Sequence, residues 1–416
     1  MVRSFCLYST TWGADVGCFG EKLPQAARTD SSDGDLLHRP LFLPGFRPII
    51  YNEKICGGRT SLARRQHYIF SDEPRRGKGW LIGTLAVLFL LLAAGFTANL
   101  VMTHTVTYTR EYVTISTLPM GLDNFTILHL SDLNGAELGD HQSAVKKAIG
   151  TRSGYGAVVL TGNMVGESGD VQPLLDLLAQ LPNSTPVLLL PGDGDPAVYA
   201  TTAHASLSAY ADWAQTLIDA GVILLDEPYS ITTGKATIWF TPENLYTMDT
   251  VSTEKAWQNQ IDALNAQVEP LTADQSALKR TAEYQVARMQ RIREKIATMK
   301  DSHIQVAVSH MPLTKESVAE SRAWATSKVF SMSNVKLILA GGYCGGQWRI
   351  PGVGAVYVPE LGFFPDDEKI TGMGYLAGVW QHISPGLGAS PDYPFMPMRL
   401  FNSPGATMIV LTATVH

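Results

Sequence analysis

Short apolar runs that end in polar, glycine-rich turns recur along the chain. The first, Phe125–Gly135, reads FTILHLSDLNG and places Asp132 and Asn134 in its turn. The same pattern returns in Val158–Asn163, Val187–Asp195, Val306–Pro312 and Leu337–Gln347. Each run predicts a buried β-strand. Because ligands gather at the carboxyl ends of strands in open α/β sheets, the five turns are expected to form one composite site at the edge of a sheet.

Helical patterns alternate with these strands. They are predicted near Asp140–Ile149, Val171–Leu181, Ala200–Ala220 and Lys315–Val329. Tyr112–Leu118 alternates β-branched and polar residues, which predicts an edge strand. Beyond Gln347, short segments rich in glycine and proline predict a second sheet of antiparallel strands that ends with Ala406–Thr412. Together these patterns predict an α/β domain over residues 103–416, a two-sheet sandwich covered by helices (α-β-β-α).

Residues 251–300 interrupt the alternation and predict an inserted helical hairpin. One apolar stripe at helical spacing consists of Trp257, Ile261, Leu264 and Val268. Thr272 and Gln275 have the spacing of a capping box, which predicts the start of a second helix. Two interpretations are open. The hairpin packs on the domain or on itself, or it is an arm that binds a partner.

A long apolar segment precedes the predicted domain. No Asp, Glu, Lys or Arg occurs from Gly79 to Met102, and about 20 apolar residues suffice to cross a bilayer. We therefore predict a transmembrane helix over residues 80–102. Basic residues stand just before it, so the positive-inside rule places residues 1–79 in the cytoplasm and the domain outside the cell membrane. A cleaved signal peptide is the alternative, although its apolar core is usually only about 7–15 residues long.

Residues 1–79 show no sustained periodicity and many turn-forming residues, which predicts a mostly disordered cytoplasmic tail. A misassigned start codon is the alternative. The formal charge of −6 and the lack of a basic stripe argue against nucleic acid as a partner. Three of the four cysteines precede the apolar segment and Cys344 follows it. The membrane would then separate them, so no intrachain disulfide is expected in the domain.

The order of the turns resembles the calcineurin-like metallophosphoesterase family, especially its bacterial membrane-associated branch. The resemblance runs from about Phe125 to Thr412 and rests on S-D-L-x-G, L-T-G-x, P-G-x-x-D, S-H-x-P, G-G-Q-x-R-x-P-G-x-G-A, G-L-G and P-M-R-L-F-N-x-P. It implies a metallophosphoesterase-like fold in which Asp, His and Asn side chains surround two divalent metals. These metals would position and activate a water for attack on phosphorus.

Most metal-ligand positions that the resemblance implies carry other residue types here. The family's D-x-H corresponds to Asp132-Leu133-Asn134, its G-D to Gly162-Asn163, its G-N-H to Gly192-Asp193-Gly194, its lone histidine to His310, and its G-H-x-H to Gly341-Gly342-Tyr343-Cys344. Only Asp132 and His310 keep the family's residue type. The resemblance also implies that Asn163 replaces a carboxylate bridging the metals, and Gly194 a histidine that assists the leaving group.

Two nearby divalent ions repel each other unless anionic and imidazole ligands surround them. Asn163 offers only a neutral amide, and Gly342 offers no side chain. Loss of a single supporting group commonly costs about 10–100-fold in metal affinity or activity, so five changes are expected to abolish the two-metal centre. No cofactor is therefore expected. The alternative is one divalent metal held by Asp132, Asp193 and His310, with Cys344 as a further ligand.

Each remaining residue also has a simpler interpretation. Asp132 and Asp195 could accept hydrogen bonds from turn amides. His310 could be a core histidine with satisfied ring nitrogens, and Cys344 a small buried apolar residue.

The sequence thus suggests a single-pass, anchored pseudo-phosphoesterase whose extracytoplasmic domain binds or scaffolds rather than hydrolyses. One rival hypothesis is an active metal-dependent phosphoester hydrolase with a rearranged, mononuclear site. The other places the working surface on the 251–300 hairpin, where an envelope protein would dock. The expected partners are the membrane and such a protein.

Overall fold

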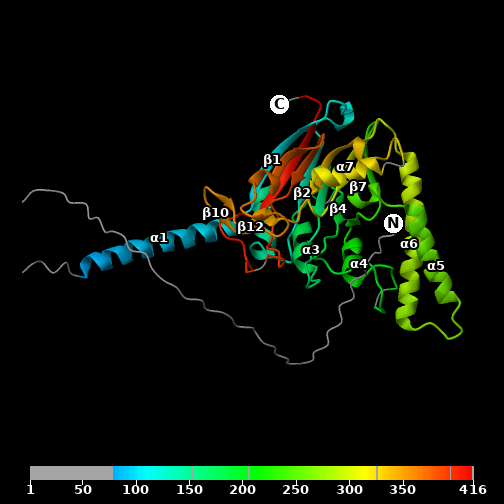
Figure 1. The fold of residues 1–416 in the computed structure, drawn as a ribbon, viewed down its shortest axis with the longest axis horizontal. Helices are drawn as coiled ribbons and strands as arrows, with labels where there is room; N and C mark the ends of the chain where they lie inside the picture. The colour runs from blue at the N-terminus through cyan, green and yellow to red at the C-terminus, as the bar shows by residue number, and fades with distance from the viewer. Residues whose placement is uncertain are drawn as a thin grey trace, which may run out of the picture. The chain divides into compact units, whose positions relative to one another are not determined.

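The computed structural model describes residues 78–150, 154–182, 184–204, 207–324, 327–393 and 395–414. Residues 1–77 of the predicted cytoplasmic tail, with its three cysteines, lie outside these ranges. Helix α1 (Gly79–His104) covers the predicted membrane segment (Figure 1). Among the described residues it is the one helix long and apolar enough to cross a membrane, and none of its residues is buried.

The first sheet has the strand order β1-β16-β2-β3-β4-β5. Its strands are β1 (Thr107–Thr114), β16 (Gly405–Thr412), β2 (Thr126–Leu130), β3 (Ala157–Thr161), β4 (Val187–Leu190) and β5 (Ile223–Leu224). Strand β16 pairs in parallel with β1 and antiparallel with β2. The prediction that Ala406–Thr412 ends the second sheet was therefore wrong. All eight of its residues are buried, as expected for a strand covered on both faces.

The second sheet has the strand order β14-β15-β9-β8-β7-β6. Its strands are β14 (Gly372–Leu376), β15 (Val379–Ile383), β9 (Val335–Ala340), β8 (Ile304–Val308), β7 (Ala236–Pro242) and β6 (Tyr229–Thr233). Antiparallel hairpins form both edges, and the strands between them run in parallel. The predicted antiparallel character therefore holds only at the edges. Two further hairpins lie outside these sheets, β10–β11 (Arg349–Ile350 and Gly354–Ala355) and β12–β13 (Tyr357–Val358 and Gly362–Phe363).

Alternate residues of the strands divide the core into layers, as the period of a strand requires. On β2, Ile127 lies in a buried cluster with residues of β7, β8 and β9, so the two sheets face each other. Leu128 and Leu130 lie in another cluster with α2 (Ser143–Ile149), α3 (Gln172–Leu178) and α4 (Asp212–Asp219). On the second sheet, Ala307 and Ile338 lie in a third cluster with α6 (Ala273–Thr298) and α7 (Lys315–Ala323). The chain is therefore an α/β protein with two facing sheets and helices outside.

Helix α4 is shorter than the predicted Ala200–Ala220. Tyr199 and Tyr210 form an isolated antiparallel bridge, and the Ala200 amide donates to the Ala209 carbonyl. The two rings stack with their centroids 5.7 Å apart, and both hydroxyl groups donate hydrogen bonds to the Asp226 carboxylate. Tertiary contacts of the two aromatic residues thus override the local helical pattern.

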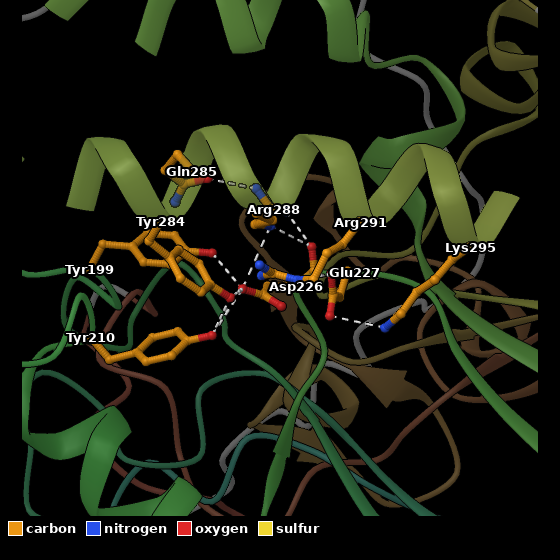
Figure 2. A network of polar contacts seen from close by, with 9 residues as sticks. All are labelled: Tyr199, Tyr210, Asp226, Glu227, Tyr284, Gln285, Arg288, Arg291 and Lys295. Atoms are coloured by element: carbon orange, nitrogen blue, oxygen red, sulfur yellow. Dashed lines mark hydrogen bonds and ion pairs between the residues drawn. The ribbon is translucent and has the colours of Figure 1, made fainter. Parts of the chain in front are cut away.

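The region of the predicted hairpin forms α5 (Thr250–Asn265) and α6 (Ala273–Thr298), and Thr272 and Gln275 make the expected capping box. Figure 2 shows how α6 is attached to the domain. The Asp226 carboxylate accepts hydrogen bonds from Tyr199 (2.9 Å) and Tyr284 (2.7 Å) and pairs with Arg288 at 3.6 Å. Beside it, Glu227 pairs with Arg291 and Lys295. Helix α6 therefore packs on the domain, and α5 packs along α6.

Candidate functional site

The turns after β2, β3, β8 and β9 meet where the two sheets come together. The Asp132 amide donates to the Gly162 carbonyl at 2.9 Å, and the Asn134 amide donates to the Asn163 carbonyl at 2.7 Å. The Gly342 amide, from the second sheet, donates to Asp132 Oδ2 at 3.0 Å. The predicted composite site thus forms, but both sheets contribute to it rather than one.

Several site residues have backbone conformations that explain their type. Asp132, Asn134 and Asn163 have φ of 52°, 50° and 51°. Asp and Asn tolerate this left-handed region better than other residues with a side chain. Asp195 supports the same turns, because its carboxylate accepts hydrogen bonds from the amides of Val165, Gly166 and Gly192 at 2.9 Å each. Asp195 therefore has the turn-stabilising contacts that its simpler interpretation predicted.

His310 has both ring nitrogens engaged by the protein. Nδ1 donates to the Thr161 carbonyl at 2.8 Å, and Nε2 lies 2.7 Å from Asp193 Oδ1. Burial alone would lower the pKa of His310. The hydrogen bond with Asp193 and the charge of Asp132 outweigh it and raise the pKa to about 9. The Asp193 contact thus favours the imidazolium form, in which both ring nitrogens donate hydrogen bonds to protein oxygens.

Asp132 is completely buried at the tip of β2. Its Oδ2 accepts hydrogen bonds from Ser131 Oγ at 2.5 Å and from the Gly342 amide. Burial raises the pKa of this carboxyl group, and the charges of His310 and Arg399 act in the opposite direction. Asp132 Oδ1 and both polar atoms of the Asn134 side chain have no hydrogen-bond partner among the described residues. These three atoms can bind a small polar ligand or water.

Arg399 is a second buried cation near Asp132 that the sequence analysis did not identify. Its guanidinium donates to the carbonyls of Gly388 (2.6 Å) and Pro385 (2.8 Å). A Cβ at Gly386 would lie 3.3 Å from Asp132 Cβ and 3.4 Å from Arg399 Nη1, so these two side chains border the same small space. The P-M-R-L-F-N motif contains Arg399, but only the fold places it beside the first turn.

The remaining predicted ligand positions are occupied by other contacts. Asn163 Oδ1 accepts a hydrogen bond from the Gly194 amide at 2.8 Å. At Gly342, an added Cβ would lie 2.4 Å from Met311 Sδ, so the methionine fills that side-chain space. Cys344 is fully buried, and burial raises the pKa of its thiol well above the ordinary value. Its contacts are those of the small buried apolar residue in the simpler interpretation.

The donor set does not fit a two-metal centre. Asp193 and His310 bond to each other, and Asn163 is engaged with a backbone amide. Within the described ranges, no group of three or more His, Cys, Asp or Glu side chains is arranged to hold a metal ion. Charge near Asp132 is balanced instead by two protein cations, His310 and Arg399.

A pocket of about 260 Å³ opens at this site. It is lined by Asn163, Asp193, His310, Met311, Gly342, Pro359, Glu360, Ser390, Asp392 and Tyr393. Three of these residues are carboxylates, and one, His310, is a cation. A second pocket of about 670 Å³ lies beside it, between Asn134 and the segment from Ala389 to Pro397. The charge of the smaller pocket disfavours a phosphate ion, since like charges repel.

A buried histidine pair lies behind the site. His129 on β2 and His382 on β15 approach with their Nδ1 atoms 2.7 Å apart, and His129 Nε2 lies 2.9 Å from Thr161 Oγ1. Burial lowers the pKa of both rings, that of His382 to about 3. The pair is therefore neutral and joins the two sheets. No sequence pattern links two histidines so far apart in the chain.

Comparisons with known proteins find remote similarity. No protein-family model and no curated protein matches the chain. Among solved structures, the phosphopantetheinyl hydrolase PptH from Mycobacterium tuberculosis is similar at 13% identity and a TM-score of 0.32, over 67% of this chain and 96% of that one. Vacuolar Protein Sorting 29 from Cryptosporidium parvum is similar at 19% identity and a TM-score of 0.18, over 34% of this chain and 61% of its own.

Proposed function

We propose that this chain is a single-pass membrane protein with a metallophosphoesterase-like domain outside the membrane, and that this domain binds a ligand rather than hydrolysing a phosphoester. The observation that carries the proposal is His310, held between the Asp193 carboxylate and the Thr161 carbonyl. In the resembling family this position ligates a metal. Here both nitrogens donate hydrogen bonds to protein oxygens.

The electrostatics of the site support the same function. Hydrolysis of a phosphoester requires positive charge around the phosphoryl oxygens. The pocket instead exposes Asp193, Glu360 and Asp392, and its cation His310 is already paired. Without metal ions, such a pocket favours a neutral or cationic polar ligand.

Activity measurements on a restored variant test this proposal. The full chain, purified in detergent, is assayed with aryl phosphates and phosphodiesters beside a variant carrying Asn134→His, Asn163→Asp, Asp193→Asn, Gly194→His, Gly342→His and Cys344→His. Asp193→Asn is included because Asp193 pairs with His310. Met311→Ala is added because Met311 fills the space at Gly342. We expect no turnover by the natural chain and metal-dependent turnover only after restoration. Metal-dependent turnover by the natural chain would refute the proposal.

The rival function is a hydrolase that uses a single metal. The unpartnered Asp132 Oδ1 and Asn134 Oδ1 favour it, because buried carboxylate and amide oxygens are typical ligands of a hard divalent ion. The substitution that discriminates is Asp132→Asn. If the rival function holds, this variant loses a metal-dependent activity that the natural chain has. If the binding function holds, neither protein shows such an activity.

The proposed orientation places the N-terminus in the cytoplasm. It rests on the Arg and Lys residues that immediately precede α1. Reporter fusions test it in a bacterial host. A reporter active only outside the cytoplasm should be active at the C-terminus and inactive at the N-terminus, and the opposite pattern would refute this topology.

A further inference from the structure

Several large apolar side chains of the domain are exposed on neighbouring loops. We call this set the apolar rim: Ile350, Val353, Phe363, Phe364, Phe395 and Met398, with exposed fractions from 44% to 94%. Single exposed apolar residues are ordinary. A group of this size at one end of a domain marks a surface that contacts a membrane or another protein.

One side-chain and two backbone hydrogen bonds hold the segments of the rim beside one another. Trp348 Nε1 donates to the Met398 carbonyl at 2.8 Å, which joins the β10 segment to the 393–398 loop. The Val356 amide donates to the Trp348 carbonyl at 2.9 Å, and the Phe364 amide donates to the Val356 carbonyl at 3.0 Å. The two small hairpins β10–β11 and β12–β13 therefore belong to the same surface.

This surface is continuous with the end of α1. Trp348 and Leu400 form a parallel bridge. The next residue, Phe401, donates its amide hydrogen to Asn99 Oδ1 of α1 at 2.7 Å. The labels β10 and β12 can be found near that end of α1 in Figure 1. The rim thus lies beside the point where the chain leaves the helix.

The length of α1 gives the depth of this contact. A helix rises about 1.5 Å per residue and the hydrocarbon core is about 30 Å thick, so about 20 residues span it. Counted from Trp80, the span ends near Asn99. Phe401 is therefore at the level where α1 leaves the hydrocarbon.

Aromatic residues are enriched at both surfaces of a membrane. Helix α1 has Trp80 at its start and Phe96 near its end, and its last eight residues, TANLVMTH, contain no Phe, Trp or Tyr. Phe363, Phe364 and Phe395 of the rim can supply the aromatic groups on that side. We propose that the apolar rim inserts into the lipid surface beside α1 and fixes the domain against the membrane.

The chemistry of the rim predicts how it binds lipid. The basic residues Arg349 and Lys369 near it pair with Asp367 and Asp366. Insertion should therefore rest on apolar contact and be independent of anionic lipid. The inference depends on the membrane anchor of the proposed function, and its test separates the two.

Site-specific fluorescence on the full chain provides that test. The native cysteines are removed with C6S, C18S, C56S and C344A, and an environment-sensitive fluorophore is attached at Phe363→Cys or Phe395→Cys. Val268→Cys, in the α5–α6 loop, is the matched exposed control. Leu90→Cys, in the middle of α1, reports the anchor. Each protein is reconstituted into phosphatidylcholine vesicles with and without lipids that carry a nitroxide quencher.

The expected result is quenching of about twofold or more at positions 363 and 395, because interfacial segments lie within the reach of such lipids. Position 90 should be quenched and position 268 unaffected. Quenching at 90 without quenching at 363 and 395 would overturn the inference and leave the anchor intact. No quenching at 90 would overturn both. A blue-shifted but unquenched signal at 363 and 395 would mean that protein covers the rim, and would also overturn the inference.

Discussion

Met311 fills the space that a side chain on Gly342 would require, since a Cβ there would lie 2.4 Å from Met311 Sδ. Gly342 also has a φ of 85°, a conformation that residues with a side chain rarely adopt. The glycine and the methionine therefore depend on each other. A metal-ligating side chain at position 342 would therefore require a change at Met311 as well.

We predict that Gly342→Ala destabilises the chain by about 1–3 kcal/mol through backbone strain and overcrowding. In a Met311→Ala background, Gly342→Ala should lower the free energy of unfolding by a smaller amount, because the crowding is relieved and only the backbone strain remains. Denaturant unfolding of the natural chain, the two single variants and the double variant measures the coupling free energy between positions 311 and 342. Additive effects would show that Met311 and position 342 do not compete for space.

Asp226 holds α6 to the domain by pairing with Arg288. Both side chains are only 10% exposed. We predict that Asp226→Asn lowers the free energy of unfolding by about 3 kcal/mol, because it leaves a buried guanidinium without its carboxylate partner. It should also expose the α5–α6 hairpin to limited proteolysis.

The control is Glu227→Gln on the neighbouring residue. The side chains of its partners, Arg291 and Lys295, are 37% and 34% exposed. We expect Glu227→Gln to lower the free energy of unfolding by about 1 kcal/mol or less, because solvent weakens exposed ion pairs. Equal effects of the two substitutions would contradict the role assigned to Asp226.

The His129–His382 pair predicts how stability depends on pH. Burial lowers the pKa of both rings below the unfolded value of about 6.5. Unfolding therefore takes up protons below that pH. The contribution of the pair to the free energy of unfolding is fully present above about pH 6.5 and declines as the pH falls. Two protons correspond to about 2.7 kcal/mol per pH unit at the steepest part of the decline.

Urea unfolding between pH 7.5 and 5 measures this slope. His382→Asn removes one of the two titrating groups and should reduce the slope by about half. A stability that is constant between pH 7.5 and 5 would contradict the buried, neutral state of the pair.

The order of strands and turns was predictable because each short apolar run ends in residues that form turns. Phe125–Gly135 contains both the strand and the turn that leads to Asp132. Two features of the fold were not predictable. Strand β16 lies in the first sheet through pairing with β1 and β2, which are distant in sequence. Helix α4 begins late because Tyr199 and Tyr210 contact Asp226.

The candidate site was predictable in its positions and less so in its contacts. Its turns follow from the strand pattern, and Asp132 and His310 were identified directly. Hydrogen-bond partners depend on three-dimensional packing, so the pairing of His310 with Asp193 could not be read from the chain. Arg399 and Met311 belong to the site only because the fold places Arg399 near Asp132 and Met311 against Gly342.

We propose that protein contacts in this chain occupy the positions at which the resembling family holds its metal pair. Elemental mass spectrometry of the purified full chain, after incubation with excess Mn²⁺ or Zn²⁺ and desalting, measures this directly. We predict far less than one metal ion per chain for the natural protein and an increase for the restored variant. Two tightly bound ions per natural chain would contradict the account.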